Sequence, residues 1–215
     1  GIPMRKSLVK CLSFVTSIMI CGAALTSCAA GASSNGGIPT EEQLSAAAEE
    51  LGDDIGSLKF SADGVIYQFP VDTKAMLDAG WYFDSDVKSE LKSIPANTLV
   101  APSVSMRKNA KNGYGITSCG VQPMNRSASE AGLEETVIYS LNFYKEKGTT
   151  LILPGGITWN STFDEVKELC GSQSAVDMEG IKYVQVNGAD RDFSVQINFD
   201  STENTVKSVE FKGRL

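Results

Sequence analysis

The sequence contains no histidine, so it lacks the side chain that proteins use most often as a general base and as a metal ligand. Serine triads and histidine-rich zinc sites are therefore excluded. A cysteine nucleophile is also disfavoured, because there is no histidine to activate a thiol. The sequence predicts a protein that is not an enzyme and that uses neither a cofactor nor a metal.

Basic residues are scarce as well. The 215 residues include 19 Lys and Arg against 26 Asp and Glu, a formal net charge of −7. Arg5, Lys6 and Lys10 lie in a segment that we expect to be removed, which leaves 16 basic residues and a net charge of −10. Phosphate binding needs a basic surface, so nucleic acid is not expected as a partner. The 42% apolar content is still enough for a real core.

Long apolar runs are limited to the N-terminal segment. Residues 4–28 begin with positive charges and continue in an apolar run from Leu12 to Leu25, which is too short for a comfortable membrane span. The run ends in Leu25-Thr26-Ser27-Cys28, which resembles the lipobox of bacterial lipoproteins. This resemblance implies cleavage before Cys28 and attachment of acyl chains to that cysteine; the alternative is an ordinary secretory signal with a chance cysteine.

The chain divides into four expected parts. Residues 1–27 form the signal peptide, and residues 28–39 are small, polar and glycine-rich, as in a flexible tether. Residues 40–148 contain a first helix, capped by Thr40 and Gln43 and ended by Gly52, and then a first α+β repeat. Residues 149–215 form a second α+β repeat.

The clearest helix signal lies between Leu153 and Gly171. Ser161 or Thr162 can accept a hydrogen bond from the first turn, and Asp164 or Glu165 follows three residues later, as in a capping box. Gly171 is the expected end of the helix. An apolar stripe is expected at Phe163, Val166, Leu169 and Cys170.

Two segments of the chain show the same order of elements. Asp63-Gly64 indicates a hairpin, and a strand ending at Pro70 is followed by a short helix, a glycine and three strand-like runs. The same order recurs 84 residues later, after Pro154. The sequence thus predicts an α+β fold of two related halves, each with short helices packed on one face of an antiparallel sheet.

The second half carries the pattern G-I-T, F-x-x-V-x-x-L-C-G, V-x-I-x-F-D and V-x-x-V-x-F between Gly156 and Phe211. This pattern is similar to repeats of the beta-lactamase-inhibitor-protein-like superfamily, which includes small lipoproteins of outer-membrane assembly. The whole chain also resembles surface lipoproteins of Gram-positive gut bacteria. The resemblance implies an α+β repeat that is used for protein–protein contact rather than for catalysis.

The strand alternation predicts a polar sheet face turned away from the helices. If residues such as Val137, Tyr139, Leu141 and Phe143 face the helices, their neighbours face outward. The outward set has few charges, whereas a merely solvated face usually carries Lys and Glu. We therefore expect a binding face there, the alternative being polar side chains that bond only one another and water. The face consists of Arg107, Gln122, Asn142, Tyr144, Gln185, Gln196 and Asn198.

Three further groups have two interpretations each. Cys119 and Cys170 remain after lipidation and predict either a disulfide or two buried apolar thiols. Asp200, Glu203 and Asn204 offer oxygen ligands but lack the calcium-loop spacing, so no metal site is predicted. Trp81 and Trp159 are expected to pack in the core, the alternative being stacking on a ligand.

These observations favour a lipid-anchored protein on the extracytoplasmic face of the cell membrane. The expected role is a non-catalytic protein-binding or scaffolding module whose partners are the membrane, through the lipid on Cys28, and another envelope protein. The alternative is a solute- or glycan-binding accessory protein of a surface uptake system.

Overall fold

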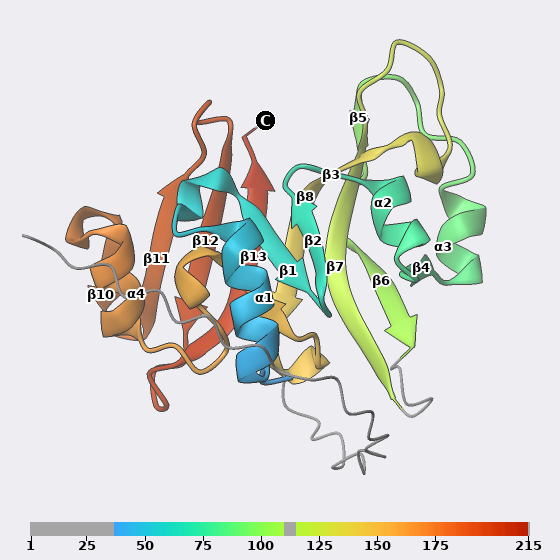
Figure 1. Ribbon diagram of the computed structural model, residues 1–215. Coiled ribbons are helices and arrows are strands. Elements are labelled where there is room, and N and C mark those ends of the chain that lie inside the picture. Colours follow the sequence, from blue (N-terminus) through green and yellow to red (C-terminus); the bar gives the residue numbers. More distant parts are fainter. Residues whose placement is uncertain (1–36, 110–114, 215) are drawn as a thin grey trace, which may run out of the picture. The chain divides into compact units, whose positions relative to one another are not determined.

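Strands dominate the structure, a computed structural model that describes residues 37–109 and 115–214. The larger antiparallel sheet has the order β10-β11-β12-β13-β8-β7-β6-β4, with β3 added on β8 and β5 on β7 (Figure 1). Its strands are β3 Val71–Asp72, β4 Tyr82–Phe83, β5 Thr98–Leu99, β6 Val104–Asn109, β7 Ile116–Asn125, β8 Val137–Tyr144, β10 Ala175–Met178, β11 Ile181–Asn187, β12 Phe193–Phe199 and β13 Val206–Gly213.

A smaller sheet and the helices complete the fold. The smaller sheet has the order β2-β1-β9, from β1 Lys59–Ala62, β2 Val65–Gln68 and β9 Leu151–Ile152. The α-helices are α1 Glu41–Leu51, α2 Thr73–Asp78, α3 Ser85–Glu90 and α4 Phe163–Cys170. Short 3-10 turns are η1 Ile55–Ser57, η2 Leu133–Glu135, η3 Lys145–Lys147, η4 Pro154–Gly156 and η5 Ser172–Ser174. The predicted α+β class with an antiparallel sheet is therefore confirmed.

The two halves share a helix followed by four strands of the large sheet, but the first half has an insertion. In the first half α2 precedes β4, β6, β7 and β8, with α3 and β5 inserted between β4 and β6, and in the second half α4 precedes β10, β11, β12 and β13. Each set runs from an edge of the sheet to its centre, where β8 and β13 pair antiparallel. Both halves contribute to one sheet and one continuous core. The helices are not equivalent, because α4 packs on β11 whereas α2 contacts β3 and η2.

The β1–β2 hairpin fills the space over the inner face of the large sheet. Asp63 and Gly64 have φ values of 51° and 84°, as a two-residue hairpin turn requires. The ring of Phe60 contacts those of Phe143 and Phe211 at centroid distances of 5.6 and 4.7 Å. The small sheet thus packs directly on β8 and β13, and α1 lies on the small sheet through Ala47, Leu51 and Ile152.

Helix α4 begins and ends as predicted. Thr162 and Glu165 form the capping box, and Gly171 ends the helix with φ 89°. Phe163 and Val166 are buried. The prediction was wrong for Leu169, which is 52% exposed because it lies at the rim of the contact, beside Gly155. The apolar stripe is therefore narrower than the spacing suggested.

A β-bulge in β8 shifts the predicted alternation. Gln122 pairs with Ser140 but Pro123 pairs with Ile138, so Tyr139 is the extra residue. Leu141 and Phe143 face the core as expected, whereas on the other side of the bulge Ile138 is fully buried and Val137 is not. The inward assignment of Val137 was wrong for this reason.

Candidate functional site

The face of the large sheet opposite the core carries polar side chains in register. One row crosses six neighbouring strands, and every member is paired with the next across the sheet. In strand order from β6 to β11 it comprises Ser105, Gly120, Asn142, Glu210, Gln196 and Gln185. We call this surface, with the flanking outward residues described next, the open face.

Two further rows flank the first. One runs through Gln122, Ser140, Lys212, Ser194 and Asn187, and the other through Tyr144, Ser208, Asn198 and Tyr183. Arg107 lies two residues from Ser105 on β6 and therefore shares its face. The register thus brings all seven predicted residues onto one face. Whether they bind a partner stays a prediction.

Side-chain hydrogen bonds hold part of the open face in place. Gln196 Nε2 donates to Asn198 Oδ1 at 2.8 Å, and Asn198 Nδ2 donates to Ser208 Oγ at 3.1 Å. Gln122 Nε2 donates to the Val100 carbonyl at 3.2 Å. Arg107 pairs with Asp84 at 3.2 Å, and Tyr144 is 42% exposed. Side chains that are already ordered lose less conformational entropy when a partner binds.

The final strand adds three residues to the open face that sequence reasoning missed or left unassigned. Ser208, Glu210 and Lys212 face outward on β13, between the predicted residues of β8 and β12. The signal was present in Val209-Glu210-Phe211-Lys212, where buried and outward residues alternate. The face therefore has one carboxylate and one ammonium near its centre rather than being almost free of charge.

Of the two interpretations of the cysteines, the structure does not contain the disulfide, because Cys119 and Cys170 are both free. Cys119 lies on β7 and Cys170 ends α4, which packs on β11. Four strand spacings separate β11 from β7, roughly 19 Å, whereas a disulfide needs Cα atoms within about 7 Å. Burial raises the pKa of both thiols, that of Cys170 to about 11, which agrees with the alternative interpretation of two apolar thiols.

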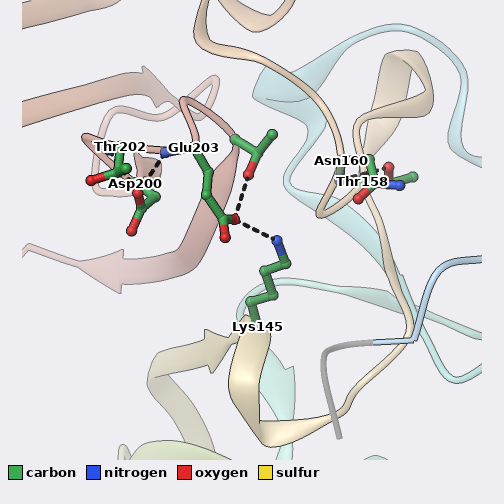
Figure 2. Close-up of polar contacts among 7 residues, drawn as sticks. Lys145, Thr158, Asn160, Asp200, Thr202 and Glu203 are labelled. Atoms are coloured by element: carbon green, nitrogen blue, oxygen red, sulfur yellow. Dashed lines mark hydrogen bonds and ion pairs between the residues drawn. The ribbon is translucent and has the colours of Figure 1, made fainter. Parts of the chain in front are cut away.

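The Asp200 loop is a hydrogen-bonded turn (Figure 2). Asp200 Oδ1 accepts from the backbone N–H groups of Thr202 and Glu203 at 2.7 and 2.8 Å, and these bonds lower its pKa. Glu203 points instead toward Lys145, 3.2 Å away. In residues 37–109 and 115–214 no group of three or more acidic or cysteine side chains is placed to hold a metal ion.

A polar cluster lies under the hairpin turn. Asp63 and Lys108 are 3.7 Å apart, with side chains only 18% and 13% exposed. Lys108 Nζ also lies 5.7 Å from the centre of the Trp81 ring.

Trp81 and Trp159 are both core residues, as predicted, and Trp159 Nε1 donates to the Thr149 carbonyl. Within the described residues, the buried side-chain nitrogen and oxygen atoms without a hydrogen-bond partner are Tyr67 Oη, Trp81 Nε1, Thr117 Oγ1 and Thr149 Oγ1.

Burial raises the pKa of Tyr67 to about 12 from an ordinary 10.0, outweighing the opposite effect of the nearby Trp81 N–H. The folded state therefore favours the neutral phenol more than the unfolded chain does. This contribution to stability is complete below pH 10 and is lost as the pH rises toward 12.

We expect Tyr67→Phe to raise the free energy of unfolding at neutral pH by about 1 kcal/mol, because it removes a buried hydroxyl that the nearby Trp81 N–H does not reach in hydrogen-bonding geometry. The same change should flatten the loss of stability between pH 10 and 12. Urea unfolding at several pH values measures both effects, with Tyr144→Phe as the exposed control. A Tyr67→Phe protein that is less stable at neutral pH and keeps the alkaline slope would contradict this account of the hydroxyl.

The predicted lipidation site, Cys28, and most of the predicted tether lie outside the described residues. Among the helices that the structure describes, none has the length and apolarity to cross a membrane. Comparisons with protein-family models, with curated proteins and with solved structures found no match. The resemblance to the beta-lactamase-inhibitor-protein-like superfamily therefore stays a prediction, and the class defined so far is a mixed α+β protein with one polar sheet face.

Proposed function

We propose that the protein is a lipid-anchored extracytoplasmic module that binds another envelope protein through the open face, without catalysis. The observation that carries the proposal is the set of three registered rows of hydrogen-bonding side chains, which are neutral except for Glu210 and Lys212. Groups of this kind can contact a partner without the large desolvation cost of isolated charges.

The dimensions of the open face suit a protein partner. Six strands at about 4.8 Å spacing extend over roughly 24 Å. A face of this width is on the scale of a standard interface, which buries about 800 Å² on each partner. Tyr144 is exposed near one margin, and tyrosine is enriched among the residues that dominate binding energy.

The charges at the centre add selectivity. Glu210 lies between Asn142 and Gln196, and Lys212 lies between Ser140 and Ser194. A partner has to match one negative and one positive position two residues apart on the same strand. A mismatch at either position would leave a charge without a counterpart, which disfavours wrong partners more than it strengthens the right one.

Changing Asn142, Tyr144 and Gln196 together to Lys should abolish capture of the partner from native envelopes. The three ammonium groups would lie on the open face, where a partner would have to desolvate them. A matched control changes Ser45, Ala48 and Ser89 to Lys, which adds the same three charges at exposed positions on α1 and α3. Both variants should unfold at the same temperature as the original protein.

Capture is measured as the amount of each co-purified protein relative to the original chain. The proposal expects a loss of at least about tenfold with the open-face variant and no loss with the control. Equal recovery with both variants, or a loss only with the control, would reject the open face as the binding surface.

A further inference from the structure

A second polar site lies beside the hairpin turn, on the opposite side of the sheet from the open face. The Asp63–Lys108 pair forms one wall of a cavity of about 190 Å³. The segments that meet there are α1, the β1–β2 turn, β6, β7 and the chain entering β9. All of its lining residues are polar or glycine: Gln43, Asp63, Lys108, Asn109, Thr117, Gly148 and Thr150.

The charges in this cavity balance, and that restricts what it can bind. Asp63 and Lys108 are both mostly buried and are the charged residues in its lining. A cation would be repelled by Lys108 and an anion by Asp63, at close range and with little screening. A neutral ligand avoids both penalties.

The hydrogen-bonding groups need a ligand that both donates and accepts. Asp63 Oδ1 accepts from the Thr150 N–H at 2.9 Å, which leaves Oδ2 facing Lys108. The distance of 3.7 Å from Oδ2 to Nζ exceeds that of a good hydrogen bond, so one hydroxyl can lie within reach of both atoms. It would donate to the carboxylate and accept from the ammonium.

We propose that this cavity binds a neutral polyhydroxylated molecule, such as one sugar unit at the end of a glycan. The cavity is smaller than the 300–1,000 Å³ typical of sites for drug-sized ligands, so it suits a single ring rather than a chain. Gln43 adds an amide nitrogen that can donate to a hydroxyl, while its oxygen already accepts from the Thr40 N–H at 2.9 Å. The site is separate from the open face and does not depend on the role proposed for that face.

The test uses the full chain with glucose, galactose and N-acetylglucosamine as neutral probes, and acetate and methylammonium as ionic probes. Saturation-transfer NMR detects binding, and amide shifts of Thr117 and Thr150 in labelled protein locate it. We expect a saccharide to bind at millimolar concentration and the two ions not to bind.

Two variants test the contributions of Asp63 and Lys108 to binding, and a third serves as the control. Asp63→Asn keeps the hairpin turn, because asparagine tolerates positive φ and its amide oxygen can still accept from Thr150. Both Asp63→Asn and Lys108→Met should weaken saccharide binding at least about tenfold, because each removes a hydrogen bond to a charged group. Asp63→Asn should also gain acetate binding, since Lys108 is then unopposed. Lys88→Met, on the exposed face of α3, is the control and should change nothing.

Saccharide binding to the unaltered chain keeps the proposal testable if the charge variants unfold. No shift with any saccharide would identify the cavity as a water site only and overturn the proposal. Saccharide binding that survives both Asp63→Asn and Lys108→Met would overturn it equally.

Discussion

Phe60→Ala is expected to lower the free energy of unfolding by about 3–5 kcal/mol, the range found for large aromatic side chains removed from cores. Phe60 has no exposed surface. Its ring lies 5.3 Å from that of Tyr67 within the hairpin, and contacts Phe143 and Phe211 in the large sheet. The substitution therefore removes packing both inside the small sheet and between the two sheets.

Equilibrium unfolding in urea measures this effect, and two further substitutions serve as comparisons. Phe60→Leu keeps most of the buried volume and should cost less than Phe60→Ala, about 1–2 kcal/mol. Tyr144→Ala removes an aromatic side chain from the exposed surface and should change stability by less than about 0.5 kcal/mol. If Phe60→Ala cost no more than Tyr144→Ala, the hairpin would not be packed on the large sheet as described.

Cys28→Ala is expected to move nearly all of the protein from the membrane fraction to the soluble extracytoplasmic fraction. The proposed anchor consists of acyl chains on this one cysteine, and several chains together give stable membrane attachment where one alone does not. Removing the thiol removes the only attachment point that the proposal assigns. The sequence Leu25-Thr26-Ser27 before Cys28 is the reason for choosing this position.

Cell fractionation with metabolic labelling by a radioactive fatty acid tests the assignment. Cys21→Ala is the matched control, because Cys21 lies in the same apolar run and carries no lipid in this account. The control should stay membrane-bound and labelled. Retention of Cys28→Ala in the membrane, or label that depends on Cys21, would count against lipidation at Cys28.

The sequence alone was sufficient to predict the elements whose signals come from residues close together in the chain. The Thr162–Glu165 capping box, the Asp63-Gly64 turn and the alternation of Phe193 to Phe199 each depend on residues a few positions apart, and all three are present in the structure. The polar residues of the open face could be predicted for the same reason. Strand pleating fixes which side each residue faces once the strand is found.

Features that depend on distant pairing could not be predicted. The bulge at Tyr139 arises from how β7 pairs with β8, and it reverses the side on which Val137 lies. The sequence could not decide between a disulfide and two free thiols, because it shows two inward cysteines but not the four strand spacings between them. The cavity beside Asp63 joins residues that are more than one hundred positions apart, from Gln43 to Thr150, and no local pattern indicates it.

Site-specific photo-crosslinking tests the central claim, that a partner protein binds the open face, most directly. A benzophenone amino acid placed at Asn142 or Gln196 lies on the open face, and one placed at Glu49 lies on exposed α1, beyond the small sheet. After illumination of intact envelopes, we expect Asn142 and Gln196 to give a covalent adduct with the same partner, and Glu49 to give none. An adduct from Glu49 alone, or the absence of an adduct from both open-face positions while the partner is still captured, would contradict the proposed function.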